Sequence, residues 1–180
     1  MAKNAFTDEA TLRKRERRPF EGHAVTAGYG AERARVLKLL NEALATEIVC
    51  ALRYRRHHFI ARGIDARSTA DEFLVHSNEK LGHADRLAER IVQLGGEPDF
   101  APDTPTRRSY AEYVAGSTLV DMIEENLVAE RIAIDCYREA IGLLGGRDST
   151  SRLILKQILA VEEQHADELD ELLQCLPVAA

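Results

Sequence analysis

Apolar residues recur at helical spacing in the first third of the chain. The segment VLKLLNEALATEIVCALRYRRHHFIAR carries them at the following positions: Leu40, Leu44, Ile48, Ala51 and Leu52. Steps of three and four residues put these side chains on one face of an α-helix, whereas a strand would alternate every second residue. The segment ends at Gly63. We therefore predict a long helix from about residue 36 to this glycine.

Start and stop signals predict a second helix after it. Thr69 is followed three residues later by Glu72, the spacing of a capping box, and Gly95-Gly96 supplies a stop. The second helix is expected over about Ala70–Leu94.

Two further helices are expected in the second half of the chain. The third spans about Leu119–Leu144 and ends at Gly145-Gly146. Capping residues over Asp148–Ser151 begin the fourth, which runs to about Cys175.

The placement of proline groups these helices into two hairpins. No proline occurs between Pro19 and Pro98 or between Pro105 and Pro177, and an interior proline would break a helix. The proline-rich segment GEPDFAPDTPTRRSY joins the two intervals. We predict an all-α four-helix bundle with a long crossover between helices 2 and 3, which makes those two helices parallel.

Composition agrees with a globular helical domain. Of the 180 residues, 45% are hydrophobic and 30% are charged, a balance that argues against a disordered chain. No apolar run approaches the roughly 20 residues of a membrane helix, and the first residues lack an apolar secretory signal. The three cysteines are too few and too scattered for a disulfide framework. We expect a cytoplasmic protein without a membrane partner.

Charge is unevenly distributed along the chain. Residues 1–20 carry a net +3, and because the whole chain carries −6, residues 21–180 carry −9. We predict a mobile basic arm over residues 1–30 and the bundle over 31–180. The arm is either a solvated tail or a weak contact for DNA, since a basic segment attracts an anionic polymer that the acidic body repels.

The two predicted hairpins repeat the same chemistry. Glu47 and Glu130 each follow a similar apolar stretch, and each precedes a tyrosine by seven residues, Tyr54 and Tyr137 respectively. A His-Ala-Asp tripeptide follows at matched spacing, with His83 36 residues after Glu47 and His165 35 residues after Glu130. We infer that these residues share one place in the bundle.

The repeated residues point to a metal site. Glu162 and His165 are three residues apart among apolar neighbours, so they share a helical face that turns inward. Buried carboxylates need a cation, and a mixed carboxylate and imidazole set suits iron, manganese or zinc. Taken alone, such a pair is often only solvated, and the two tyrosines equally suit a packing role. We expect the other histidines to be ordinary surface or core residues: His57, His58 and His76.

Four stretches carry a family resemblance over about residues 36–172: LNEALATE, HADRLAERIVQLGGEPDF, LVAERIAIDCYREAI and EEQHADELDELL. They resemble the ferritin-like superfamily, and most closely bacterioferritin and the Dps-like ferritins. The resemblance implies a diiron centre in which Glu47 and His83 bind one iron, Glu130 and His165 bind the other, and Glu162 bridges.

The resemblance also implies a function. Such a protein oxidises Fe(II) with O2 or H2O2 and stores Fe(III), which serves iron homeostasis and protection against oxidative stress. Its catalytic residues would be Glu47, Glu130 and Glu162, with Tyr54 as an additional electron donor.

One expected ligand is missing from the pattern. The partner of Glu162 in the first half should lie three residues before His83, and that residue is Lys80. An ammonium repels a metal ion, so we expect one or two irons per chain, or another divalent metal. In one version Lys80 forms an ion pair across the site while Glu130, Glu162 and His165 hold the metal. In the other Lys80 swings out and Glu79 enters through a helix irregularity.

Two further departures bear on cofactor and assembly. Leu81 stands where bacterioferritins place a methionine heme ligand, so no heme is expected. Only 15 residues follow His165, which favours a 12-chain cage over a 24-chain cage with a fifth helix.

Lys80 also leaves open whether the chain is an enzyme. The alternative is a catalytically weakened structural or DNA-shielding assembly, and a ferritin-like oxygenase ranks third because no feature specifies an organic substrate.

Overall fold

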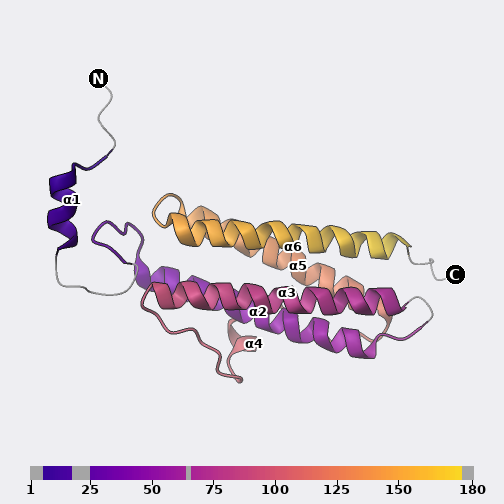
Figure 1. The fold of residues 1–180 in the computed structure, drawn as a ribbon. Helices are drawn as coiled ribbons and strands as arrows, with labels where there is room; N and C mark the ends of the chain where they lie inside the picture. The colour runs from indigo at the N-terminus through magenta and orange to yellow at the C-terminus, as the bar shows by residue number, and fades with distance from the viewer. Residues whose placement is uncertain (1–5, 18–24, 64–65, 176–180) are drawn as a thin grey trace.

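The structure, a computed structural model, describes residues 6–17, 25–63 and 66–175. In these ranges it has six helices and no strand: α1 (Glu9–Glu16), α2 (Arg33–Ile60), α3 (Ala66–Gln93), α4 (Pro105–Arg108), α5 (Leu119–Leu144) and α6 (Ser149–Cys175). The four long helices lie side by side as a four-helix bundle (Figure 1), so the predicted all-α architecture is confirmed. Among the helices in the described ranges, none has the combination of length and hydropathy that a membrane span requires.

The long connection between α3 and α5 determines the relative directions of the two hairpins. Helices α2 and α3 form one antiparallel hairpin, and α5 and α6 form the other (Figure 1). The chain between α3 and α5 returns along the bundle through the short helix α4, so α3 and α5 run in the same direction, as predicted.

Buried polar groups attach this crossover to α2 and α5. Arg53 donates to the carbonyl of Glu112 at 2.6 Å and to Asn126 Oδ1 at 3.0 Å. Asn126 is also 3.0 Å from His57 Nδ1, and His57 Nε2 reaches the carbonyl of Ala115 at 2.9 Å. Because the buried polar groups satisfy one another, the loop has a defined position on the bundle.

The start of α3 differs from the prediction. The helix begins at Ala66, so Thr69 and Glu72 lie inside it and do not form its capping box. Thr69 is buried. A threonine followed three residues later by a glutamate can be an N-cap or can lie inside the first turn of a helix. The packing of that turn decides which of the two positions the threonine takes.

The start of α6 agrees with the predicted cap. Asp148 Oδ1 accepts a hydrogen bond from the backbone N–H of Ser151 at 2.9 Å. The same carboxylate pairs with Arg90 of α3 at 2.9 Å and accepts from the Tyr29 hydroxyl at 2.7 Å. Asp148 therefore ties the end of one hairpin to the other.

The core has two main apolar clusters, one towards each end of the bundle, and a small third one formed by Cys50, Ala111 and Ala129. The larger main cluster contains Leu40, Leu44, Leu87, Ile91, Leu155 and Ile158, among others. The smaller main cluster contains Tyr54, Phe73, Met122, Ile123, Leu127 and Leu169. Buried acidic and basic side chains fill the region between the two main clusters, on the middle turns of the four long helices.

The N-terminal region contains a helix within the predicted basic arm. Helix α1 buries no residue and has Arg13, Lys14 and Arg15 in its last turn. It stands beside the end of the bundle (Figure 1). Residues 1–5 and 18–24 of the predicted arm lie outside the described residues, and the division at residue 30 stays a prediction.

Candidate metal centre

The middle of the bundle holds a group of buried ionisable side chains. Helix α2 contributes Glu47, α3 contributes Lys80 and His83, α5 contributes Glu130, and α6 contributes Glu162 and His165. Each is at most 5% exposed. All five residues predicted as metal ligands therefore come together, because the two-hairpin topology brings the matching turns of four helices to the same level.

Lys80 lies among the carboxylates. Its Nζ is 2.5 Å from Glu130 Oε2, 4.0 Å from Glu47 Oε2 and in direct contact with Glu162 Oε2. Burial opposes the charged ammonium, but the three carboxylates outweigh it and raise the pKa of Lys80 well above its ordinary value. Lys80 is thus a cation fixed among three glutamates, which agrees with the ion pair of the first version; the ligand set of that version, Glu130, Glu162 and His165, stays a prediction.

One half of the centre groups Glu47, His83 and Glu162. His83 Nδ1 lies 2.9 Å from Glu162 Oε1 and 3.4 Å from Glu47 Oε2, and one ligand atom from each residue falls within 4.8 Å of the others. The structure therefore groups Glu162 with Glu47 and His83, whereas the sequence hypothesis had paired Glu162 with Glu130 and His165.

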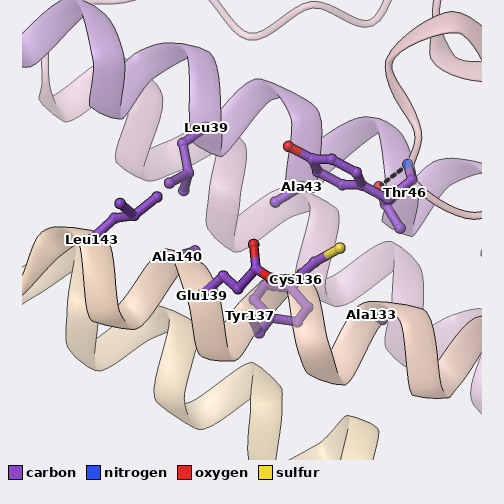
Figure 2. Close-up of a pocket in the computed structure, with 10 residues that line it drawn as sticks. Leu39, Ala43, Thr46, Ala133, Cys136, Tyr137, Glu139, Ala140 and Leu143 are labelled. Carbon is purple, nitrogen blue, oxygen red and sulfur yellow. Dashed lines mark hydrogen bonds between the residues drawn. The ribbon is translucent and has the colours of Figure 1, made fainter.

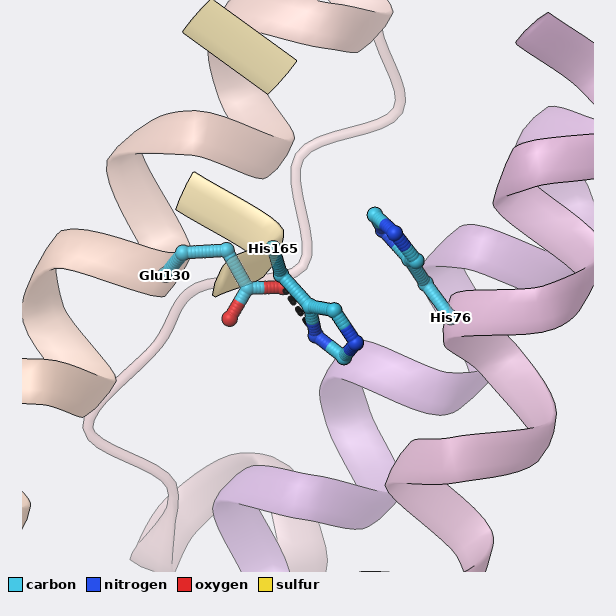
Figure 3. Close-up of side chains that lie close together, drawn as sticks. All are labelled: His76, Glu130 and His165. Carbon is cyan, nitrogen blue, oxygen red and sulfur yellow. Dashed lines mark ion pairs between the residues drawn. The ribbon is translucent and has the colours of Figure 1, made fainter. Parts of the chain in front are cut away.

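The other half groups Glu130 with two histidines. Glu130, His76 and His165 extend from α5, α3 and α6 towards one another (Figure 3), with ligand atoms within 4.8 Å. His165 Nδ1 is 3.7 Å from Glu130 Oε1, and the rings of His76 and His165 stack with centroids 3.9 Å apart. His76 was expected to be an ordinary histidine. Its position two turns before His83 was the only sequence signal that could have included it.

Glu79 occupies an outer position at this half of the centre. Its Oε2 is 2.7 Å from His165 Nε2, and its side chain is half-exposed. Helix α3 is continuous through this region, so Glu79 does not enter among the other carboxylates in place of Lys80. A carboxylate on Nε2 instead directs the opposite nitrogen, Nδ1, towards Glu130, as outer carboxylates do for histidines that bind metals.

Each tyrosine of the repeat reaches across to the other hairpin. Tyr54 of α2 donates a hydrogen bond to Glu130 of α5 at 2.5 Å, and Tyr137 of α5 donates one to Glu47 of α2. The repeated seven-residue spacing therefore produces a reciprocal pair of contacts. Burial and the neighbouring carboxylates raise the pKa values of both tyrosines, so both remain protonated donors.

The carboxylates differ in their affinity for a proton. Burial favours the neutral form of each, but Lys80 overcomes this at Glu47 and Glu130, whose pKa values are lowered. Burial followed by the charge of Glu47 raises the pKa of Glu162 to about 8. Burial opposes charge on His83, yet Glu162 and Glu47 raise its pKa to about 9. At neutral pH the centre therefore retains protons at Glu162 and His83.

The buried ligand atoms of the centre show whether a metal ion fits there. Glu47 Oε2, His83 Nδ1 and Glu162 Oε1 are buried and lie close to one another, with no other hydrogen-bond partner. Buried polar atoms are costly unless another group satisfies them. Together the three residues offer two oxygens and one nitrogen to an ion. These residues fit a first-row divalent metal.

A pocket on the outer side of the bundle approaches the centre. It has a volume of about 90 Å³ and lies between α2 and α5 (Figure 2). Its lining is mostly apolar and includes Thr46, Cys136 and Tyr137. Because Tyr137 also donates a hydrogen bond to Glu47, one lining residue of this pocket contacts the candidate centre.

Comparison with known proteins identifies the family to which this fold belongs. Residues 37–178 match the model of the ferritin-like domain. A bacterioferritin of Mycobacterium avium is 30% identical over 142 residues, which cover 78% of this chain and 85% of the relative.

Solved structures agree with this assignment. A dodecameric thioferritin, the bacterioferritin-related protein of Bacteroides fragilis, superimposes with a TM-score of 0.77 at 28% identity, covering 81% of this chain and 88% of that one. Dps of Thermosynechococcus elongatus shares the fold, with a TM-score of 0.75 at 23% identity over 78% of this chain and 90% of its own. The match to the domain model, the bacterioferritin relative and the four-helix arrangement together place this chain in the ferritin-like family.

Proposed function

We propose that this protein binds Fe(II) at the centre of its bundle, oxidises it with O2 or H2O2 and stores the Fe(III) product. The observation that carries the proposal is the grouping of buried donor atoms from Glu47, His83 and Glu162, which lie within 4.8 Å of one another. Iron is the substrate and cargo here, and these three residues would be its principal ligands. Iron homeostasis and protection from oxidative stress are the expected physiological roles.

Charge favours one iron at the centre rather than two. Once Glu162 and His83 have released their protons to a metal, three carboxylates and the protonated Lys80 sum to −2, which balances one Fe(II). A second divalent ion would exceed this negative charge, and the ammonium beside Glu130 and Glu162 already adds its repulsion to that of the first ion. Glu130 and His165 therefore support the centre beside Lys80, and they become ligands only if Lys80 is removed.

The electron balance gives Tyr54 a role. Reducing H2O2 to two waters requires two electrons and two protons, and one Fe(II) supplies one electron. Tyr54 would supply the other as it becomes a neutral radical, passing its phenolic proton to Glu130, to which it is hydrogen-bonded. Solvent supplies the two protons that the peroxide takes up, and another Fe(II) reduces the radical as Glu130 returns its proton to the tyrosine oxygen. We favour Tyr54 over Tyr137 because Glu130, unlike Glu47, is not an iron ligand in this proposal.

An anaerobic Fe(II) titration followed by oxidation with H2O2 tests the proposal. The parent chain should bind about one iron at the centre, and Lys80→Glu should bind about two, because the added carboxylate restores charge balance. Lys156→Glu makes the same charge change on the exposed side of α6 and is the matched control. Absence of iron binding in both the parent and Lys80→Glu would contradict the proposal.

We propose a 12-chain cage as the assembly. The related thioferritin of Bacteroides fragilis, 28% identical to this chain, is dodecameric. A cytoplasmic location and the absence of heme remain predictions. Sedimentation before and after iron loading would measure the assembly and its mineral content, and a stable monomer would contradict it.

A specific observation favours a second function. Lys80 already neutralises part of the centre, and the ion pairs could replace catalysis with a purely structural role. The exposed basic turn of α1 would then contact DNA weakly through Arg13, Lys14 and Arg15. This alternative predicts salt-sensitive DNA retention that disappears on deletion of residues 1–20, together with Fe(II) oxidation no faster than in buffer.

A further inference from the structure

A second group of potential ligands lies beside the centre and includes neither Lys80 nor the proposed iron ligands. Glu72 and His76 are four residues apart on α3, and Glu168 extends from α6. His76 Nε2 is 3.0 Å from Glu168 Oε2 and 3.3 Å from Glu72 Oε1. One ligand atom from each of the three residues lies within 4.8 Å of the other two.

The three side chains combine a buried nitrogen with accessible oxygens. The side chain of His76 is 1% exposed, whereas those of Glu72 and Glu168 are 40% and 34% exposed. An ion from solvent could therefore reach the carboxylates and meet the imidazole at the inner side of the pair. This arrangement differs from the central group, in which every proposed ligand is buried.

Two aromatic rings hold the imidazole of His76 in place, and its Nδ1 atom makes no hydrogen bond. Its ring stacks on His165 and meets the Tyr54 ring edge-on with centroids 5.2 Å apart. Its Nδ1 is buried and has no hydrogen-bond partner. A metal on Nε2 would leave the ring proton on Nδ1, so no existing hydrogen bond of Nδ1 would be broken. A neutral imidazole can donate the lone pair of Nε2 to a metal.

The charge of the group is not neutralised by protein. Within the described ranges, neither Glu72 nor Glu168 has a lysine or arginine partner within 4.0 Å. Their two negative charges match one divalent cation. Glu168 is further oriented by Gln164, whose amide donates to Oε1 at 2.7 Å and leaves Oε2 directed at His76.

We propose that Glu72, His76 and Glu168 form a second site for a first-row divalent transition metal such as Fe(II), Mn(II) or Zn(II). Two carboxylate oxygens and one imidazole nitrogen suit these ions, while Mg(II) and Ca(II) prefer oxygen ligands alone. The site fills from the solvent-exposed edge of α3 and α6 and does not require the centre to be occupied. It goes beyond the proposed oxidation and storage of iron.

Cobalt is a suitable probe because Co(II) is not oxidised under anaerobic conditions and its visible spectrum reports nitrogen ligation. Purified, metal-free full-length protein is titrated with Co(II) alone. Glu72→Gln/Glu168→Gln should bind about one cobalt fewer per chain than the parent, since the amides carry no charge. Glu171→Gln removes an exposed carboxylate from the same turn of α6 and should bind as the parent does. Circular dichroism checks that each variant is folded.

Glu47→Gln separates this site from the centre. Loss of cobalt in Glu72→Gln/Glu168→Gln but not in Glu47→Gln would support the second site and count against the proposed function. Loss in Glu47→Gln with no loss in Glu72→Gln/Glu168→Gln would overturn the second site and leave the proposed function standing.

Magnesium competition tests the role of the imidazole. Excess Mg(II) should leave the cobalt bound, because it does not replace a transition metal at a nitrogen ligand. Displacement by Mg(II) would show binding to surface carboxylates alone and would overturn the inference.

Discussion

Lys80 Nζ lies 2.5 Å from Glu130 Oε2, and both groups are completely buried. The contact joins α3 to α5, helices from different hairpins, at the position where the sequence pattern expected a carboxylate. Lys80 also contacts Glu162 of α6. A side chain of the protein therefore provides the positive charge that the neighbouring carboxylates require in the absence of metal.

Replacing Lys80 by methionine should destabilise the metal-free protein. The substitution leaves Glu130 and Glu162 buried without their cation, which typically costs about 3–5 kcal/mol. Thermal denaturation should show a lower midpoint, and added Mn(II) should recover more of the loss than it adds to the parent. Lys156→Met, on the exposed side of α6, should change little. Equal stability of metal-free Lys80→Met and parent would show that the ion pairs contribute no net stability.

Metal affinity at the centre should increase with pH. Glu162 has a pKa of about 8 and His83 a pKa of about 9, so both are largely protonated at pH 7 and must lose their protons to bind a metal. Affinity is therefore weakest at low pH, rises through the range from 7 to 9 and levels off above it. Calorimetry with Zn(II) in buffers of different ionisation enthalpy should detect about two protons released per ion at pH 7. Release of no protons would contradict these assignments.

The reciprocal tyrosines provide a matched pair of variants. Tyr54→Phe removes the hydrogen bond to Glu130, and Tyr137→Phe removes the one to Glu47. Each should lower the free energy of unfolding by about 1–3 kcal/mol, because a buried carboxylate loses a donor. Chemical denaturation of the metal-free proteins measures this effect.

The same two variants test the proposed electron transfer. After addition of H2O2 to the Fe(II)-loaded protein, Tyr54→Phe should lack the tyrosyl radical signal in electron paramagnetic resonance, while Tyr137→Phe should retain it. The reverse pattern would assign the electron to Tyr137.

Asp148 should stabilise the fold independently of metal. Asp148→Ala removes the cap of α6 and leaves Arg90 without its buried partner, a combined loss of about 2–4 kcal/mol. Burial opposes ionisation, but hydrogen bonds from Ser151, the bond from Tyr29 and the charge of Arg90 lower the pKa of Asp148. Its contribution is therefore fully present above pH 3.8, the value for an unperturbed aspartate, and is lost as pH falls through the lower folded value.

Denaturation of Asp148→Ala and the parent at pH 7 and at acid pH measures this contribution. The difference between them should narrow on acidification. Asp167→Asn, at an exposed position on α6, is the control. A difference that does not change with pH would exclude a role for the Asp148 charge.

Local spacing in the sequence was sufficient to predict the four long helices. Apolar positions three and four residues apart define one face of each helix, and Gly95 and Gly145 adopt the positive φ angles that end α3 and α5. The capping box at Thr69 failed because a short polar pattern is common to caps and to first turns. The sequence spacing alone cannot distinguish a cap from a first turn, because the difference depends on what the turn packs against.

The repeat was sufficient to predict which residues share the centre. Glu47, His83, Glu130, Glu162 and His165 occupy equivalent turns of two similar hairpins, and any antiparallel pairing of those hairpins brings them to one level. Their division into groups was not predictable, since it depends on which helices are neighbours and how each is rotated about its axis.

The sequence alone thus determined the helices, their pairing and the composition of the buried centre, because helical periodicity and an internal repeat are properties of spacing along the chain. Tertiary structure alone decided that each tyrosine bonds the glutamate of the opposite hairpin, that Lys80 lies among the carboxylates, and that His76 joins the site. These contacts join residues up to 90 positions apart. Their geometry follows from the packing of one helix against another, which no spacing within a single helix can specify.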